Sequence, residues 1–139
     1  MTESSKGIRI LFVCVENAGR SQMAEAFAER EGFQATSAGT VPAESINPTV
    51  VEAMTERGLN LLSKKPKMLT MEMVDRAEAV ITMGCSVEEV CPRPMLARMQ
   101  KKLIDWNLPD PKGKPLPEVR KIRDEIERKV EALAHGGGV

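Results

Sequence analysis

Apolar residues occur along the chain in two alternating patterns, short continuous runs and repeats of three or four residues. Residues 8–13 (IRILFV) form a continuous run rich in β-branched side chains, which is typical of a strand covered on both faces of a parallel sheet. Residues 21–30 (SQMAEAFAER) are strong helix formers with apolar side chains on one face, and Gly32 ends the pattern. The N-terminal part of the chain therefore predicts a strand, a short loop and a helix.

The same alternation continues towards the C-terminus. The further predicted elements are a strand at 34–38, a helix at about 48–57, a short helix within 70–78, a strand at 79–83 and a short strand at 103–105. A final amphipathic helix is predicted from apolar residues at three- and four-residue steps: Leu116, Val119, Ile122, Ile126, Val130 and Leu133. Such alternation predicts an α/β fold with an open, mostly parallel sheet, whose ligand site lies beyond the C-terminal ends of the strands.

Length and composition narrow this picture. The 139 residues, 42% of them hydrophobic, suit one domain (1–139) with a flexible tail at about 135–139. Twenty acidic and twenty basic side chains cancel, which favours neither a nucleic-acid nor a membrane partner. The apolar run near the N-terminus is too short for a secretory signal or a membrane span, so we expect a cytoplasmic protein. We also expect a monomer.

Cys14 follows the first predicted strand, and Arg20 comes six residues later, where the predicted helix begins. A loop entering a helix N-terminus directs backbone N–H groups and the positive end of the helix dipole towards one point, which stabilises an oxyanion or a thiolate. Arg20 adds a planar guanidinium that binds two oxygens at once. The predicted oxyanion-binding residues are therefore Val15, Glu16, Asn17, Ala18, Gly19, Arg20 and Ser21. The alternative is a buried cysteine at a strand end beside a surface arginine.

Three residues of this loop have expected roles in its conformation. Asn17 and Gly19 tolerate the left-handed dihedral angles that a tight anion-binding loop requires. Ser21 either caps the helix or donates a hydrogen bond to the Cys14 sulfur. We therefore expect Cys14 to act as a thiolate nucleophile towards a tetrahedral oxyanion.

Residues 11–26 (LFVCVENAGRSQMAEA) resemble the signature of the low-molecular-weight protein tyrosine phosphatase superfamily, and RSQMAE resembles its arsenate reductase branch. Further segments resemble landmarks of that branch in the same order: 37–40 (SAGT), 47–54 (NPTVVEAM), 80–92 (VITMGCSVEEVCP), 105–114 (DWNLPDPKGK) and 118–133 (EVRKIRDEIERKVEAL). The resemblance spans nearly the whole chain. It implies a four-stranded parallel sheet with helices on both faces.

The resemblance also implies that Asp110 is a general acid, and the following Pro111 restricts the aspartate to extended geometry. Protonating the departing oxygen would assist either phosphate ester cleavage or arsenate reduction. In the phosphatases, tyrosines that hold an aryl substrate typically follow this Asp-Pro pair, whereas here Lys112 and Gly113 follow and the chain has no tyrosine. Trp106 is the nearby ring that would flank the pocket, with simple core packing as the alternative.

Cys85 and Cys91 complete the cysteine content. With His135 as the one histidine, their spacing is poor for zinc, so no bound metal or cofactor is predicted. Two inert core cysteines are the alternative to a functional pair. The resemblance implies a relay in which Cys85 attacks the sulfur of the Cys14 adduct, arsenite leaves, and Cys91 then pairs with Cys85.

The resemblance leaves the electron donor open. Many relatives have a second cysteine before the loop arginine where this chain has Gly19, and Cys85 stands one residue later than in the thioredoxin-coupled arrangement. The expected partners are an arsenate- or phosphate-like oxyanion and an external thiol reductant, either thioredoxin or a low-molecular-weight thiol. The favoured function is arsenate reduction. The alternatives are a tyrosine or aryl phosphatase acting through phosphocysteine and a non-enzymatic oxyanion or redox sensor.

Overall fold

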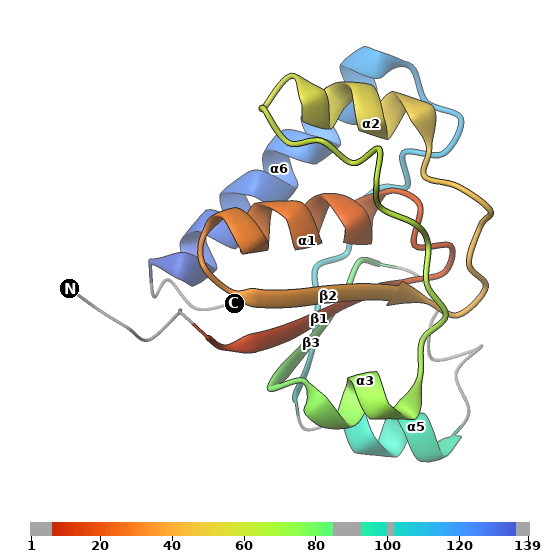
Figure 1. Cartoon of the computed structure of the whole chain (residues 1–139), viewed down its shortest axis with the longest axis vertical. Helices are drawn as coiled ribbons and strands as arrows, with labels where there is room; N and C mark the ends of the chain where they lie inside the picture. The colour runs from red at the N-terminus through yellow and green to blue at the C-terminus, as the bar shows by residue number, and fades with distance from the viewer. Residues whose placement is uncertain (1–6, 85–92, 100–101, 136–139) are drawn as a thin grey trace.

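The computed structural model describes residues 7–84, 93–99 and 102–135 (Figure 1). Within these ranges the strands form one parallel sheet in the order β2-β1-β3-β4. The strands are β1 (Arg9–Cys14), β2 (Gln34–Gly39), β3 (Ala79–Thr82) and β4 (Leu103–Asp105). The predicted α/β fold with a four-stranded parallel sheet is confirmed.

The register aligns the C-terminal ends of the strands. Cys14, the last residue of β1, is opposite Gly39 of β2, and Val13 is opposite Thr82 of β3. Thr82 in turn is opposite Asp105, the last residue of β4. Because all four strands are parallel, the loops that follow them emerge at the same edge of the sheet.

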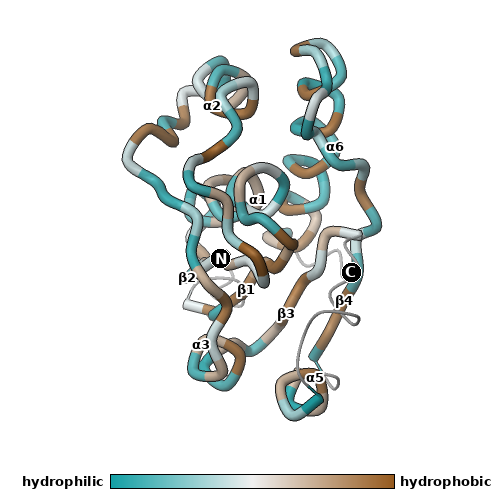
Figure 2. The backbone as a smooth tube through the Cα atoms, turned by 90° about the vertical axis from the view of Figure 1, so that its right-hand side faces the viewer, coloured by the Kyte–Doolittle hydropathy of each residue, from teal (hydrophilic) through white to brown (hydrophobic). Residues whose placement is uncertain are grey.

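Helices cover both faces of the sheet (Figure 1). Helices α1 (Arg20–Arg30) and α6 (Leu116–Ala134) pack on one face, and α2 (Pro48–Thr55) packs against α6. The shorter helices α3 (Met71–Arg76) and α5 (Arg93–Met99) cover the other face. Figure 2 shows hydrophobic residues along β3 and β4 between these two layers.

The two-residue period of β1 divides its side chains between two cores. Ile10, Phe12 and Cys14 belong to the core beneath α1 and α6. Leu11 and Val13 belong to the core beneath α3 and α5. The period therefore places the Cys14 side chain on the same face of the sheet as α1.

Helix α6 follows the predicted apolar repeat. Val119, Ile122, Ile126 and Val130 are buried against the sheet, while Leu116 and Leu133 are partly buried at its two ends. Burying one such aliphatic side chain contributes roughly 1.5–3 kcal/mol, so this face anchors the helix. No helix within the described ranges is long and apolar enough to cross a membrane.

Helix α5 was not predicted from the sequence. Pro94 near its start resembles loop punctuation, but it occupies the second position of the helix. Proline is tolerated in a first turn because the backbone N–H groups there have no partner within the helix. Met95 and Met99 are buried on its inner face, so packing on the sheet selects the helix.

Charged side chains join α2 to α6. Arg123 is buried, and its guanidinium donates to the Ala53 carbonyl oxygen at 2.9 Å and to Glu56 Oε1 at 2.7 Å. Arg120 donates to Glu56 Oε2 through Nη2 at 2.7 Å. The hydrogen bond from Arg120, followed by that from Arg123, lowers the pKa of Glu56 from 4.5 to about 2.

Replacing Glu56 by Gln is expected to flatten the acid dependence of stability. The folded-state pKa of Glu56 lies below its unfolded value, so its stabilisation is complete above about pH 4.5 and is lost as pH falls towards 2. The free energy of unfolding of the wild type should therefore fall more steeply over this window than that of E56Q, measured by urea titration. Glu44→Gln is the control and should retain the wild-type slope. If the free energies of unfolding of wild type and E56Q fell equally steeply with pH, a lowered pKa of Glu56 would be contradicted.

Candidate active site

Residues 15–19 connect β1 to α1 and wrap around the Cys14 sulfur. The Cys14 side chain is buried, and its Sγ accepts a hydrogen bond from the Asn17 backbone N–H at 3.2 Å. Ser21 Oγ lies 2.9 Å from the same sulfur. Because α1 begins at Arg20, its positive end lies beside the sulfur. Each of these features favours a thiolate over a neutral thiol.

Asn17 has the predicted left-handed backbone, with φ at 53°. Its side-chain oxygen accepts from the Lys67 backbone N–H at 2.8 Å and from Gln22 Nε2 at 3.0 Å. Its side-chain nitrogen donates to Ser21 Oγ at 2.7 Å and to Ser37 Oγ at 2.9 Å. Four hydrogen bonds therefore hold Asn17 in a conformation that few residues adopt.

Gly19 does not have the predicted left-handed conformation, since its φ is −144°. Its small size matters for a different reason: a Cβ atom there would lie 2.8 Å from Pro111 Cγ. The loop that carries Asp110 therefore packs directly on Gly19. Gly19 is also the residue that precedes α1, and no side chain caps this helix. Of the two roles predicted for Ser21, the structure shows the contact with Cys14 and not the cap.

Arg20 projects from the first turn of α1 and is held by backbone carbonyl groups. Its Nη1 donates to the carbonyl oxygens of Met83 and Leu108, both at 2.7 Å. These carbonyl groups come from the segments that follow β3 and β4, and Arg20 itself follows β1. The guanidinium therefore links the segments that follow three strands. Hydrogen bonds to a charged group contribute about 1.5–3 kcal/mol each. Arg20 is thereby oriented before any ligand binds.

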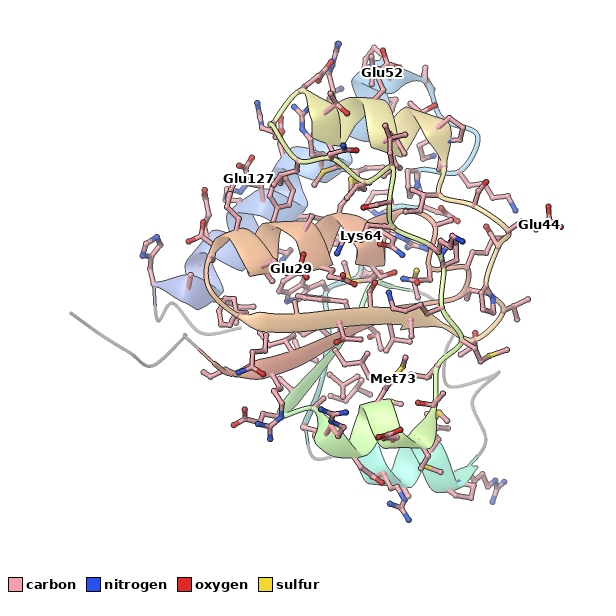
Figure 3. All side chains as sticks on the ribbon, viewed as in Figure 1. Glu29, Glu44, Glu52, Lys64, Met73 and Glu127 are labelled. Atoms are coloured by element: carbon pink, nitrogen blue, oxygen red, sulfur yellow. The ribbon has the colours of Figure 1, made fainter. Side chains whose placement is uncertain are left out.

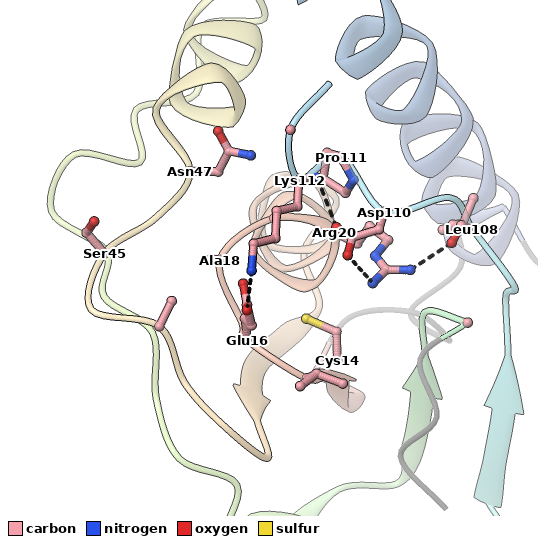
Figure 4. A pocket seen from close by; sticks show the side chains of 15 residues that line it. Cys14, Glu16, Ala18, Arg20, Ser45, Asn47, Leu108, Asp110, Pro111 and Lys112 are labelled. Carbon is pink, nitrogen blue, oxygen red and sulfur yellow. Dashed lines mark hydrogen bonds and ion pairs between the residues drawn. The ribbon is translucent and has the colours of Figure 1, made fainter. Parts of the chain in front are cut away.

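Asp110 faces Arg20 across the same cavity (Figure 4). Its Oδ2 lies 3.8 Å from Arg20 Nη2, and its Oδ1 accepts from the Lys112 backbone N–H at 3.0 Å. The Asp110 side chain is 60% exposed, so it can exchange protons with solvent. Cys14, Arg20 and Asp110 therefore lie together at the edge of the sheet where the sequence predicts the ligand site.

These side chains line a cavity of about 750 Å³. Most of its lining comes from the β1–α1 loop and from residues 108–113: Cys14, Val15, Glu16, Ala18, Gly19, Arg20, Leu108, Asp110, Pro111, Lys112 and Gly113. The sequence did not indicate Ser45 and Asn47, which line the cavity from the segment preceding α2. Asn17 and Ser21, although predicted to bind the oxyanion, support the loop from behind and are not part of the lining.

Trp106 does not flank the cavity. Its ring is buried and lies 5.8 Å from that of Phe12, centroid to centroid, beneath α6. The packing alternative is therefore correct. Among the described residues, the lining of the cavity contains no aromatic side chain.

An ion pair lies at the mouth of the cavity. Lys112 Nζ is 2.9 Å from Glu16 Oε2, so the pair connects the β1–α1 loop to the Asp110 loop (Figure 4). The hydrogen bond that Lys112 donates to Glu16, together with the negative charge of Glu16, raises the pKa of Lys112. Both side chains are substantially exposed, so the pair adds little to stability, yet it places a positive charge near the cavity.

Cys85 and Cys91 lie outside the described residues, and so does their predicted relay. The described segment ends at Gly84, which lines the cavity. Within the described ranges, no three His, Cys, Asp or Glu side chains converge as metal ligands would.

Comparison with known proteins agrees with this geometry. Residues 9–136 match the model of the family described as low molecular weight phosphotyrosine protein phosphatase. A protein of Halobacterium salinarum is 40% identical, covering 88% of this chain and 87% of its own length. The arsenate reductase of Brevibacillus brevis is 30% identical, covering 92% and 95%.

Solved structures of other proteins also resemble the chain, and two of them are informative. The arginine phosphatase YwlE of Geobacillus stearothermophilus superposes with a TM-score of 0.80 at 28% identity, covering 93% of this chain and 92% of its own. The thioredoxin-dependent arsenate reductase of Corynebacterium glutamicum has a TM-score of 0.73 at 36% identity, covering 96% of this chain and 63% of its own. Sequence, fold and cavity agree, and the chain belongs to the low molecular weight phosphotyrosine protein phosphatase family.

Proposed function

We propose that the protein is an arsenate reductase in which Cys14 is the nucleophile. The observation that carries this proposal is the convergence of the Cys14 sulfur, the Arg20 guanidinium and the Asp110 carboxyl group on one cavity. The backbone N–H groups of the loop and Arg20 bind the arsenate oxygens. The Cys14 thiolate attacks arsenic, and Asp110 donates a proton to the oxygen that leaves as water. The product is a Cys14–arsenic(V) adduct.

Reduction requires a second thiol. Cys85 attacks the Cys14 sulfur, a sulfur–sulfur bond forms, and the electrons of the broken arsenic–sulfur bond reduce arsenic(V) to arsenic(III). Arsenite then leaves. Cys91 attacks Cys85, which releases the Cys14 thiolate and leaves a Cys85–Cys91 disulfide. An external thiol returns this disulfide to two thiols.

Known relatives support this proposal. The arsenate reductase of Brevibacillus brevis aligns over nearly the whole chain, and the Corynebacterium glutamicum protein is a thioredoxin-dependent arsenate reductase. For this chain we infer an external thiol reductant, either a thioredoxin or a low-molecular-weight thiol. The reaction takes place in a cytoplasmic, monomeric protein that binds no metal.

The second candidate is a phosphatase that uses the same loop. Arsenate and phosphate share a tetrahedral shape and charge, so Cys14 is equally placed to form a phosphocysteine. The structural similarity to an arginine phosphatase favours this reading. The cavity lining argues against an aryl substrate, because the described residues that form it include no aromatic ring on which such a substrate could stack.

Replacing Asp110 by Asn tests its role as proton donor. The amide keeps the shape of the side chain but cannot deliver a proton to the leaving oxygen, so arsenate turnover should fall about 10²- to 10⁴-fold. Steady-state arsenite release measures this effect. Phosphate should bind to D110N at least as well as to wild type, because a negative charge 3.8 Å from Arg20 has been removed. Full turnover by D110N would contradict the assignment.

A further inference from the structure

Glu25 is a buried carboxylate that the proposed reaction does not use. It lies on α1, and its side chain is only 6% exposed. An isolated carboxylate in such a place destabilises the fold unless a counter-charge and hydrogen bonds compensate. Lys64 Nζ lies 3.0 Å from Glu25 Oε2, and Lys67 Nζ lies 3.7 Å from Glu25 Oε1. Two cations from a distant segment therefore neutralise one buried acid.

Lys64 reaches Glu25 from the segment between α2 and α3, which passes over α1 (Figure 3). Its ammonium also contacts Glu29 Oε1 at 3.3 Å. Partial burial acts to lower the pKa of Lys64, but the hydrogen bond and negative charge of Glu25, followed by those of Glu29, outweigh it and raise this pKa. Lys64 is therefore charged at neutral pH.

A chain of hydrogen bonds links Glu25 to the nucleophile. Ser37 Oγ donates to Glu25 Oε1 at 2.5 Å, because an ionised carboxylate only accepts. Having used its proton, Ser37 Oγ accepts from Asn17 Nδ2. The other Nδ2 proton of Asn17 goes to Ser21 Oγ, which lies 2.9 Å from Cys14 Sγ. Every link from Glu25 to Cys14 is a buried side chain.

Proton counting gives this chain a direction. Asn17 must present its nitrogen to the two serines, because its oxygen accepts from the Lys67 backbone N–H. Ser21 therefore accepts from Asn17 and retains its own proton. Within the described part of the chain, the Cys14 sulfur is the acceptor available to that proton. Ser21 can therefore donate its proton to the Cys14 sulfur, a hydrogen bond that stabilises the thiolate form.

We propose that Lys64, assisted by Lys67, is a built-in counter-cation of Glu25 and thereby a positioning residue for the Cys14 thiolate. This inference rests on the proposed function, since it assumes that Cys14 reacts as a thiolate. Without the Lys64 ammonium, the buried Glu25 carboxyl group loses its nearest counter-charge and no longer has a fixed position. Ser37 then loses its fixed acceptor, Asn17 loses part of its support, and the Ser21 hydrogen bond to sulfur weakens.

Other charged groups also act on the Cys14 sulfur and must stay constant in the test. They lie on the β1–α1 loop, at the start of α1 and on the loop after β4: Glu16, Arg20, Asp110 and Lys112. Lys64 and Glu25 have other partners, since Lys64 also contacts Glu29, and Glu25 also contacts Ser37 and Lys67. Replacing Lys64 therefore changes the supporting network and leaves the cavity lining in place.

The test is the pH profile of iodoacetamide alkylation at Cys14 in the full chain, followed by mass spectrometry of the Cys14 peptide. In Lys64→Met the profile should move to higher pH, with alkylation at pH 6 about threefold to tenfold slower than in wild type. Lys67→Met should show a smaller effect, because its ammonium is farther from Glu25. Lys65→Met is the matched control, since the Lys65 side chain is exposed and outside the network.

Two further variants separate positioning from mere packing. Lys64→Arg keeps the charge and should restore the wild-type profile. The double variant E25Q/K64M removes both charges and should recover part of the loss seen in Lys64→Met alone. A Lys64→Met profile that matches Lys65→Met would overturn the inference, as would a double variant no better than Lys64→Met. If Lys64→Met fails to fold, Lys67→Met decides in its place: its profile should lie at higher pH than that of Lys65→Met, and identical profiles would overturn the inference.

The wild-type arm of the same experiment tests the proposed function separately. A wild-type profile centred near the ordinary thiol value of about 8.5 would count against a thiolate nucleophile. A low wild-type profile with no response to Lys64 would contradict the counter-cation alone.

Discussion

Arsenite formation is expected to disappear when Cys14 is replaced by Ser. The change substitutes one atom and keeps the hydrogen bonds around it, but a serine hydroxyl is not ionised at neutral pH and cannot accept electrons from a second thiol. We expect turnover to fall more than about 10⁴-fold, to the background of the assay. Arsenite release measured with excess thiol reductant provides the test.

Oxyanion binding is the control for this variant. Arg20 and the backbone of the β1–α1 loop are unchanged in C14S, and Arg20 remains fixed by the carbonyl oxygens of Met83 and Leu108. Phosphate should therefore still raise the thermal unfolding midpoint of C14S. Retained arsenite formation by C14S would remove Cys14 from the reaction. Loss of both phosphate binding and turnover would instead indicate a damaged loop.

Replacing Cys85 by Ser is expected to stop the reaction after the first step. Cys14 should still attack arsenate, but no internal thiol would then attack its sulfur. Multiple-turnover arsenite release should fall by at least about 10³-fold when thioredoxin is the reductant. Rapid-quench measurements should show neither arsenite nor an oxidised Cys14.

Cys91→Ser provides a matched control that also loses one thiol. In this variant Cys85 can still attack Cys14, so one equivalent of arsenite should be released and a Cys14–Cys85 disulfide should accumulate. The two variants therefore differ in their first turnover. Sustained turnover by C85S with a thioredoxin system would remove the relay from the account, and an identical block in both variants would show that the order of the thiols is wrong.

Local sequence patterns predicted much of the fold, because the strand and helix that carry the site are each specified by residues close together in the sequence. The apolar run at 8–13 and the helix formers at 21–30 gave β1 and α1 to within one residue. The left-handed conformation of Asn17 was also predicted, because asparagine tolerates it better than most residues. Helix α5 was missed because its stability comes from Met95 and Met99 on the sheet, which no local pattern encodes.

Contacts between distant segments could not be predicted. Gly19 was expected to supply left-handed dihedral angles, but its backbone is at φ −144° and its size matters because Pro111 packs on it. Likewise, the sequence does not reveal that Lys64 lies 3.0 Å from Glu25, since 39 positions separate the two residues. Such pairings depend on the assembled tertiary structure, in which α1 and the segment before α3 cross.

The position of Asp110 shows how the fold combines these parts. Parallel pairing brings the strand ends together, and the Arg20 guanidinium then links the segments that follow β3 and β4 by binding a carbonyl group in each. The Asp110 loop then packs on Gly19 and carries its carboxyl group to within 3.8 Å of Arg20. The proposed nucleophile, anion-binding cation and proton donor therefore lie close together in one cavity, as the proposed catalysis requires.

Arsenate reductase activity is tested first by measuring arsenite production from arsenate by the purified, reduced protein, with thioredoxin and a small-thiol system supplied in separate reactions. Mass mapping of the disulfides should follow. We expect sustained arsenite release with one of the two reductants, together with a Cys85–Cys91 disulfide in protein quenched without reductant. No arsenite with either reductant, combined with steady hydrolysis of an aryl phosphate, would contradict the reductase and assign the site to phosphate ester hydrolysis.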